Sequence, residues 1–203
     1  MPALLHGLLT GLALIVAIGS QNVFVLRQGL RREHVLAVVV VCTLSDVVLI
    51  SAGAGGLGLL VAGAPQLVQV ARWAGAAFLV GYALLAARRA LRPTGEALEA
   101  EGPTGRRGGT TAVALTALAL TWLNPHVYLD TVLLLGSVAA THGPDRWQFA
   151  LGAVVGSALW FSALGFGARA LSGPLASPRA WRVLDALVAV TMIVVAVMLV
   201  TGG

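Results

Sequence analysis

The sequence contains no lysine, one cysteine and only eight acidic residues. Charged residues make up 10% of the chain, whereas a soluble domain has about 25%, which argues against a water-soluble globular enzyme. The lone Cys42 excludes an intramolecular disulfide framework and a structural zinc site built from several thiolates. The chain also lacks the metalloprotease, serine-hydrolase, phosphate-loop and dinucleotide-binding motifs.

Apolar residues are abundant instead: they form 58% of the chain, and the mean hydropathy is +0.91. A bilayer core of about 30 Å is crossed by a helix of roughly 20 mostly apolar residues. Six stretches have this length, so we predict an all-α polytopic membrane protein with six transmembrane helices. The predicted spans are 3–26, 35–62, 67–87, 111–140, 147–171 and 183–200.

Residues 88–110 are rich in charge, proline and glycine, which is typical of a solvated linker. The linker separates a first three-helix half, residues 1–87, from a second three-helix half, residues 111–203. Three spans per half insert the two halves in opposite orientations, as inverted repeats require. We therefore predict two inverted three-helix repeats, although the sequence echo between the halves is weak.

The arginines are distributed unevenly between the two ends of the predicted spans. Eleven of the thirteen lie in the first, third and fifth connections, and only Arg72 and Arg146 lie on the other side. Because positively charged loops stay inside, this bias predicts a cytoplasmic linker with both termini outside. It also explains most of the net charge of +5 without nucleic acid as a partner.

Two acidic residues, Asp46 and Asp130, fall inside predicted spans. A carboxylate near the middle of a bilayer costs about 2.5–3.5 kcal/mol on insertion scales, so such groups face the bundle interior and often serve transport or proton transfer. Two alternatives stay open for each residue. It could be a neutral, hydrogen-bonded aspartic acid, or it could form an internal ion pair with an arginine.

The first and fourth predicted spans are interrupted by polar or helix-breaking residues, at Gly19-Ser20-Gln21-Asn22 and at Asn124-Pro125. Proline removes a helical hydrogen bond, and asparagine can bond the freed backbone groups. Paired interruptions of this kind point to a transporter site, where half-helix N-termini face an anionic group such as an amino-acid carboxylate. A proline kink that only improves packing is the alternative.

His126 and Asp130 are spaced i, i+4, so they are expected to share a helix face as a metal pair or a proton relay. No third metal ligand is evident nearby, and a packed histidine is the favoured interpretation; we expect no metal and no cofactor. Gly152 and Gly156 form a GxxxG spacing, for which a contact within the chain is favoured over a homodimer contact.

Several motifs resemble those of the LysE-type exporters, in particular the branch that exports basic amino acids. They are residues 18–26 (IGSQNVFVL) with 28–32 (QGLRR), 44–46 (LSD), 121–131 (TWLNPHVYLDT), 160–161 (WF) and 171–175 (LSGPL). By motif position the resemblance points to Asn22, Asp46, Asn124, Pro125 and Asp130. One departure is Ser20, which stands where the family often has proline.

The residues and the resemblance together predict a secondary exporter of L-lysine or L-arginine, which exchanges substrate for protons in a bacterial cell membrane. The full set of candidate substrate- or proton-binding residues is Asp46, Asp130, Asn22, Asn124, Pro125, Gln21, Ser45, His126 and Tyr128. Membrane lipids surround such a protein, and a homodimer stays open. The alternatives are a metal-cation exporter of related architecture and a channel or non-transporting membrane subunit.

Overall fold

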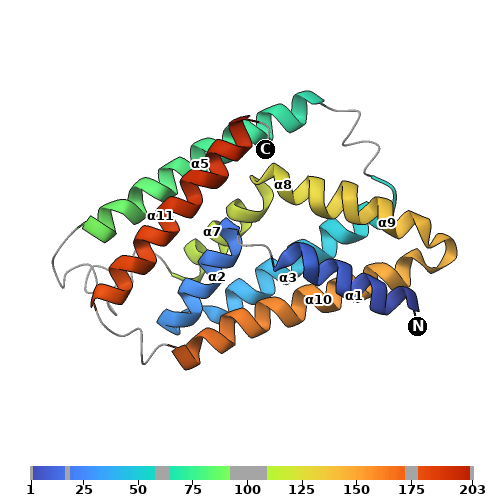
Figure 1. Ribbon diagram of the computed structural model, residues 1–203, viewed down its shortest axis with the longest axis horizontal. Helices are drawn as coiled ribbons and strands as arrows, with labels where there is room; N and C mark the ends of the chain where they lie inside the picture. Colours follow the sequence, from blue (N-terminus) through green and yellow to red (C-terminus); the bar gives the residue numbers. More distant parts are fainter. Residues whose placement is uncertain (1, 17–18, 58–64, 92–108, 172–177, 202–203) are drawn as a thin grey trace.

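The computed structural model describes residues 2–16, 19–57, 65–91, 109–171 and 178–201, and all regular structure in these ranges is helical (Figure 1). The α-helices are α1 (Pro2–Ile15), α2 (Ser20–Arg31), α3 (Val35–Ala54), α5 (Pro65–Leu91), α7 (Thr110–Trp122), α8 (Pro125–Val127), α9 (Leu135–Thr141), α10 (Arg146–Gly167) and α11 (Pro178–Thr201). A π-helix, η1 (Tyr128–Leu134), joins α8 to α9, and two 3-10 turns, η2 (Gly143–Asp145) and η3 (Ala168–Leu171), flank α10. The all-α prediction is confirmed for the described residues.

The helices long and apolar enough to cross a membrane are fewer than predicted. Among the described residues, two pass on length and composition, Val35–Ala54 and Gly143–Gly167. A third is added if α1 and α2 are counted together as one broken span. The predicted total of six spans thus remains a prediction.

The first predicted span is interrupted, as expected, and its two helices α1 and α2 meet at 85°. The first helix ends at Ile15, and the second begins at Ser20 after the extended residue Gly19. Ser20, Gln21 and Asn22 therefore form the first turn of α2 rather than the break itself. The fourth predicted span is interrupted where expected, since α7 ends at Trp122 and α8 begins at Pro125.

The other predicted spans match single helices with shifted ends. The second is shorter than predicted, since α3 ends at Ala54, and residues 58–64 lie outside the described part of the chain. The third, fifth and sixth correspond to α5, α10 and α11. Most of the predicted linker, residues 92–108, and most of the 171–175 motif also lie outside the described residues.

Two long helix pairs frame the molecule: α1 packs along α10, and α5 packs along α11 (Figure 1). The central helix α3 contacts α10, α7, η1 and α9, and α2 contacts α10, α11, α3 and α7. The largest buried cluster joins apolar residues of α2, α3, α5, α7, α10 and α11. On the outside, Leu36, Leu44 and Leu159 are more than half exposed. Large exposed apolar surfaces of this kind suit contact with lipid.

Glycines allow two pairs of helices, α1 with α10 and α3 with α9, to approach one another at backbone distance. A Cβ placed on Gly152 of α10 would lie 2.8 Å from Leu8 N of α1, and a Cβ on Gly136 of α9 would lie 2.9 Å from Gly53 Cα of α3. Both distances are too short for a real side chain. Small residues therefore permit these crossings, as is common between membrane helices. The favoured interpretation of the GxxxG spacing, a contact within the chain, agrees with this packing.

Candidate functional site

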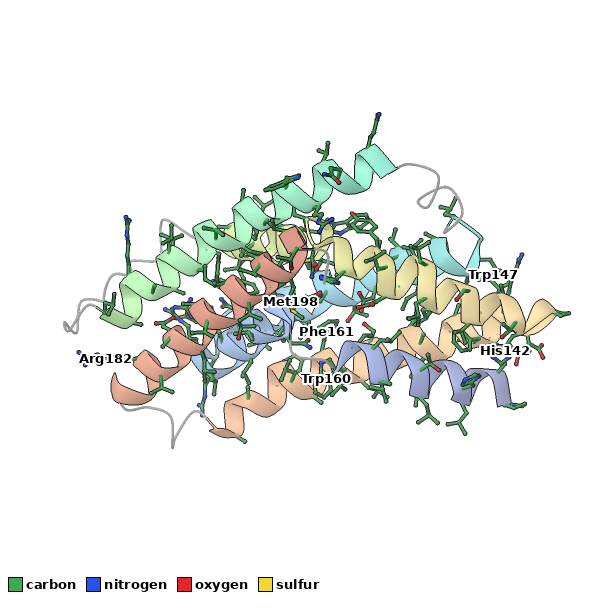
Figure 2. All side chains as sticks on the ribbon, turned by 45° about the horizontal axis from the view of Figure 1, so that its top comes forward. His142, Trp147, Trp160, Phe161, Arg182 and Met198 are labelled. Atoms are coloured by element: carbon green, nitrogen blue, oxygen red, sulfur yellow. The ribbon has the colours of Figure 1, made fainter. Side chains whose placement is uncertain are left out.

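A cavity of about 320 Å³ opens between the two interrupted segments. Its walls come from α1, α2, α3, α8, η1, α10 and α11, together with the two breaks. Phe161 of α10 and Met198 of α11 both line it, and Figure 2 shows them near the middle of the bundle. Ligand pockets in proteins measure about 300–1,000 Å³, so this cavity has room for a small molecule.

Asp46 projects from the middle of α3 into this cavity and is 4% exposed. Its Oδ2 accepts a hydrogen bond of 2.6 Å from the hydroxyl of Ser157, which is fully buried on α10. The structure therefore supplies a hydrogen-bond donor for Asp46, as the hydrogen-bonded alternative requires. One carboxylate has about four lone-pair sites, so Asp46 can still accept bonds from a ligand.

The side chain of Asn22 stabilises the first break through two hydrogen bonds. Its Nδ2 donates to the carbonyl of Ile15 at 2.7 Å, and its Oδ1 accepts from the indole Nε1 of Trp160 at 3.2 Å. The carbonyl of Ile15 lies in the last turn of α1, where carbonyl groups have no N–H donor within the helix. The side chain of Asn22 thus satisfies a helix end and ties the bend to α10.

The second break uses a comparable device. Since Pro125 has no backbone N–H, the carbonyl of Thr121 instead accepts from Asn124 N at 3.3 Å. The N–H of His126 donates to Asn124 Oδ1 at 3.2 Å, while the carbonyl of Trp122 accepts from the Tyr128 hydroxyl at 2.8 Å. Side chains therefore take over the hydrogen bonds that a continuous helix would make, as they do in the first break.

Asp130 lies within the π-helix and is partly buried at the cavity wall. His126 lines the same cavity, so the two side chains share a face as their spacing predicts. Thr131, which the sequence did not single out, also lines the cavity and donates its hydroxyl to the carbonyl of Val127. Short π-helical segments frequently occur at functional sites.

The N-terminus of α2 also faces the cavity, through Gly19, Ser20 and Gln21. Ser20 is fully buried, and its hydroxyl has no hydrogen-bond partner among the described residues. Backbone N–H groups in the first turn of a helix are likewise unsatisfied and carry a partial positive charge. This corner of the cavity is therefore suited to an anionic group.

Six of the nine predicted site residues line this cavity. They are Gln21, Asn22, Asp46, Asn124, His126 and Asp130. Ser45 and Tyr128 do not line it: Ser45 Oγ accepts from Trp122 Nε1 at 3.1 Å, and the Tyr128 ring packs edge-on against Trp122. Pro125 is the first residue of α8.

The donor set gives no cluster suited to a multidentate metal site. Within the described residues, no group of three or more His, Cys, Asp or Glu side chains comes together to hold an ion. Cys42 is buried. The cavity therefore offers carboxylates, amides, two hydroxyls and one imidazole, which are groups that suit an organic cation or zwitterion.

Sequence reasoning missed a third acid inside a predicted span, Asp185. Its Oδ1 lies 3.2 Å from the guanidinium of Arg27, and both side chains are at most one-tenth exposed. The signal was present, because Asp185 falls within the predicted sixth span. Arg27 was interpreted only as a topology marker, whereas it forms a buried ion pair that joins α2 to α11.

Comparison with known proteins gives a consistent result. A family profile described as LysE type translocator matches residues 12–203. The chain is 41% identical to a lysine exporter of Corynebacterium efficiens and 40% identical to one of Corynebacterium glutamicum, and each comparison covers all of both chains. It is 53% identical to a Mycobacterium tuberculosis protein whose name proposes amino-acid transport, over 92% of this chain and 90% of that one. No solved structure matches the chain.

Proposed function

The chain belongs to the LysE family of translocators, and we propose that it exports L-lysine or L-arginine in exchange for protons. The chain is an amino-acid exporter and a multi-pass helical protein of the cell membrane. Members of this family are transporters, not enzymes.

One observation carries the proposal: Asp46 and Asp130, from the two halves of the chain, line the same cavity. Intramembrane carboxylates are costly and mark ion or substrate pathways. Two of them facing one cavity supply negative charge for the ammonium or guanidinium group of a basic amino acid. The cavity volume of about 320 Å³ matches a ligand of that size class.

The opposite end of the substrate fits the N-terminus of α2. An amino-acid carboxylate placed there would accept hydrogen bonds from first-turn N–H groups and from the buried Ser20 hydroxyl. A substrate bound in this way places its positive side chain toward Asp46 and Asp130. The cavity thereby distinguishes a cationic amino acid from a neutral one by charge.

Proton exchange follows from the electrical cost of export. Moving one positive charge outward against about 100 mV costs about 2.3 kcal/mol. A proton entering on the same carboxylates as the substrate leaves cancels this charge movement. We infer that Asp46 and Asp130 bind the cationic substrate and the proton in turn, with Asn22, Asn124 and the other cavity residues shaping the site.

The packing supports the six-span, inverted-repeat arrangement. If α1, α2, α3 and α5 correspond to α7, α8–α9, α10 and α11, two contacts between the halves have counterparts: α1 with α10 matches α7 with α3, and α2 with α11 matches α8 with α5. The helices α5 and α11 have 27 and 24 residues. At about 1.5 Å per residue, both exceed the thickness of a bilayer core.

The predicted orientation fits the two ends of the bundle. Arg182 lies at one end and Trp147 at the other (Figure 2). The arginine bias therefore assigns the Arg182 end to the cytoplasm and the Trp147 end to the outside, with both termini outside. Residues 88–110 join the halves as a cytoplasmic linker in this arrangement.

Competition for export in proteoliposomes tests the substrate assignment. Efflux of labelled arginine should be inhibited by lysine and ornithine, but not by a neutral amino acid of similar length. The substitution Asp130→Asn should reduce this efflux at least tenfold. Asp145→Asn is the matched control, because Asp145 is exposed in the turn before α10 and bonds Gln148.

Two results would contradict the proposal. Equal competition by neutral and cationic amino acids would remove the role of the carboxylates in recognition. Competition by divalent cations, with none by lysine, would favour the alternative of a metal-cation exporter.

A further inference from the structure

Two histidines from distant parts of the chain meet at the end of the bundle opposite Arg182. His6 Nδ1 on α1 lies 2.9 Å from His142 Nε2, at the turn that follows α9. Figure 2 shows His142 at this end, close to Trp147. Both imidazoles are accessible, since His6 is exposed and His142 is half-buried. The pair lies outside the cavity and has no role in the proposed transport chemistry.

A buried aromatic ring holds the two imidazoles in place. Phe149 of α10 is fully buried, the His142 ring stacks on it at 5.0 Å, and the His6 ring meets it edge-on at 5.5 Å. Next to His6, Gly7 allows α1 to lie directly against the backbone of Phe149. The rings therefore rest on a rigid contact between α1 and α10, so little side-chain entropy remains to be lost when they bind a ligand.

The two nitrogens lie at hydrogen-bond distance, and their spacing is close to that of two ligands on one metal ion. Zinc binds imidazole nitrogen at about 2.0–2.1 Å with tetrahedral angles, which places two ligand nitrogens about 3.4 Å apart. The observed 2.9 Å needs an opening of about half an ångström. We propose that His6 and His142 form a two-histidine binding site for a divalent transition metal such as Zn²⁺, with water completing the coordination.

A metal ion at this site would tie the two halves of the chain together. The helix α1 ends at Leu14 and Ile15 in the cavity wall, and α9 continues directly from the π-helix that carries Asp130. Transport requires the halves to move relative to each other around the binding site. Bound Zn²⁺ therefore inhibits export from a site distinct from the substrate cavity.

Calorimetric titration of the purified full-length protein with ZnCl₂ tests binding without any transport measurement. The wild-type protein should bind one ion that is lost, or weakened at least tenfold, in both His6→Asn and His142→Asn. His34→Asn is the matched control, because His34 bonds Thr110 and is separate from this pair. Zinc binding that is unchanged in the His6 and His142 variants, or absent in the wild type, would overturn the site.

Efflux from proteoliposomes tests the consequence. Zn²⁺ should slow arginine efflux at least fivefold in the wild type and in His34→Asn, but not in His6→Asn or His142→Asn. Equal inhibition of all four proteins would show that the zinc effect arises elsewhere, for example at His126 in the cavity. Because the calorimetry needs no substrate, failure of the transport assignment leaves the metal site independently testable.

Discussion

The buried ion pair between Arg27 and Asp185 permits a quantitative prediction. The substitution Asp185→Asn removes the negative charge that lies 3.2 Å from the guanidinium. At this separation and an effective dielectric constant of about 20, the gross attraction is about 5 kcal/mol. Removing one partner of a buried pair costs about 3–5 kcal/mol, because the remaining charge stays desolvated. We expect Asp185→Asn to lower the free energy of unfolding by this amount.

The double substitution separates pairing from burial. Replacing both Arg27 and Asp185 by leucine removes the attraction and the desolvation cost together, so it should be far less damaging than Asp185→Asn alone. Glu33→Gln is the matched control. It breaks the pair between Arg31 and Glu33 at 3.1 Å, where the Glu33 side chain is 48% exposed, and such pairs contribute about 0.2–1 kcal/mol.

The assay is denaturant titration of the purified protein in detergent, followed by tryptophan fluorescence. The predicted order of stability places the wild type, Glu33→Gln and the double variant together, with Asp185→Asn well below them. If Asp185→Asn and Glu33→Gln prove equally mild, the reasoning about this buried pair is refuted.

Three further substitutions test separate features. Gly152→Ala should destabilise the protein by about 1–3 kcal/mol, because the added Cβ would clash with the backbone of α1. In the same titration, Gly81→Ala should stabilise the protein by up to about 1 kcal/mol, because a Cβ at Gly81 has no atom within 4 Å among the described residues. Ser157→Ala removes the 2.6 Å bond to Asp46 and should change the KM for arginine without lowering the melting temperature by more than a few degrees; an unchanged KM would count against this contact. Tyr128→Phe frees the carbonyl at the second break and should cost about 1 kcal/mol of stability, whereas a neutral result would mean that water replaces the hydroxyl.

Local sequence signals predicted the breaks and the cavity acids well. Asn124-Pro125 predicts an interruption inside a helix, because proline lacks the N–H group that the ladder of hydrogen bonds needs. A carboxylate inside an apolar span must face the interior, and Asp46 and Asp130 do so. These inferences need only the neighbouring residues, so the sequence alone supports them.

The missing features depend on contacts between distant segments. Ser157 and Trp160 bond Asp46 and Asn22 only because α10 packs against α3 and α2. Ser45 was expected at the site, but its hydroxyl instead accepts a hydrogen bond from the indole N–H of Trp122. Tertiary packing decides such pairings, and the spacing of residues along one helix does not reveal them.

The coupling of arginine efflux to protons through Asp46 tests the central claim most directly. Wild-type proteoliposomes loaded with labelled arginine should release it faster when the outside is made acidic, and Asp46→Asn should lose both the efflux and its response to the pH gradient. Arginine efflux that is unchanged by the pH gradient and by Asp46→Asn would contradict the account.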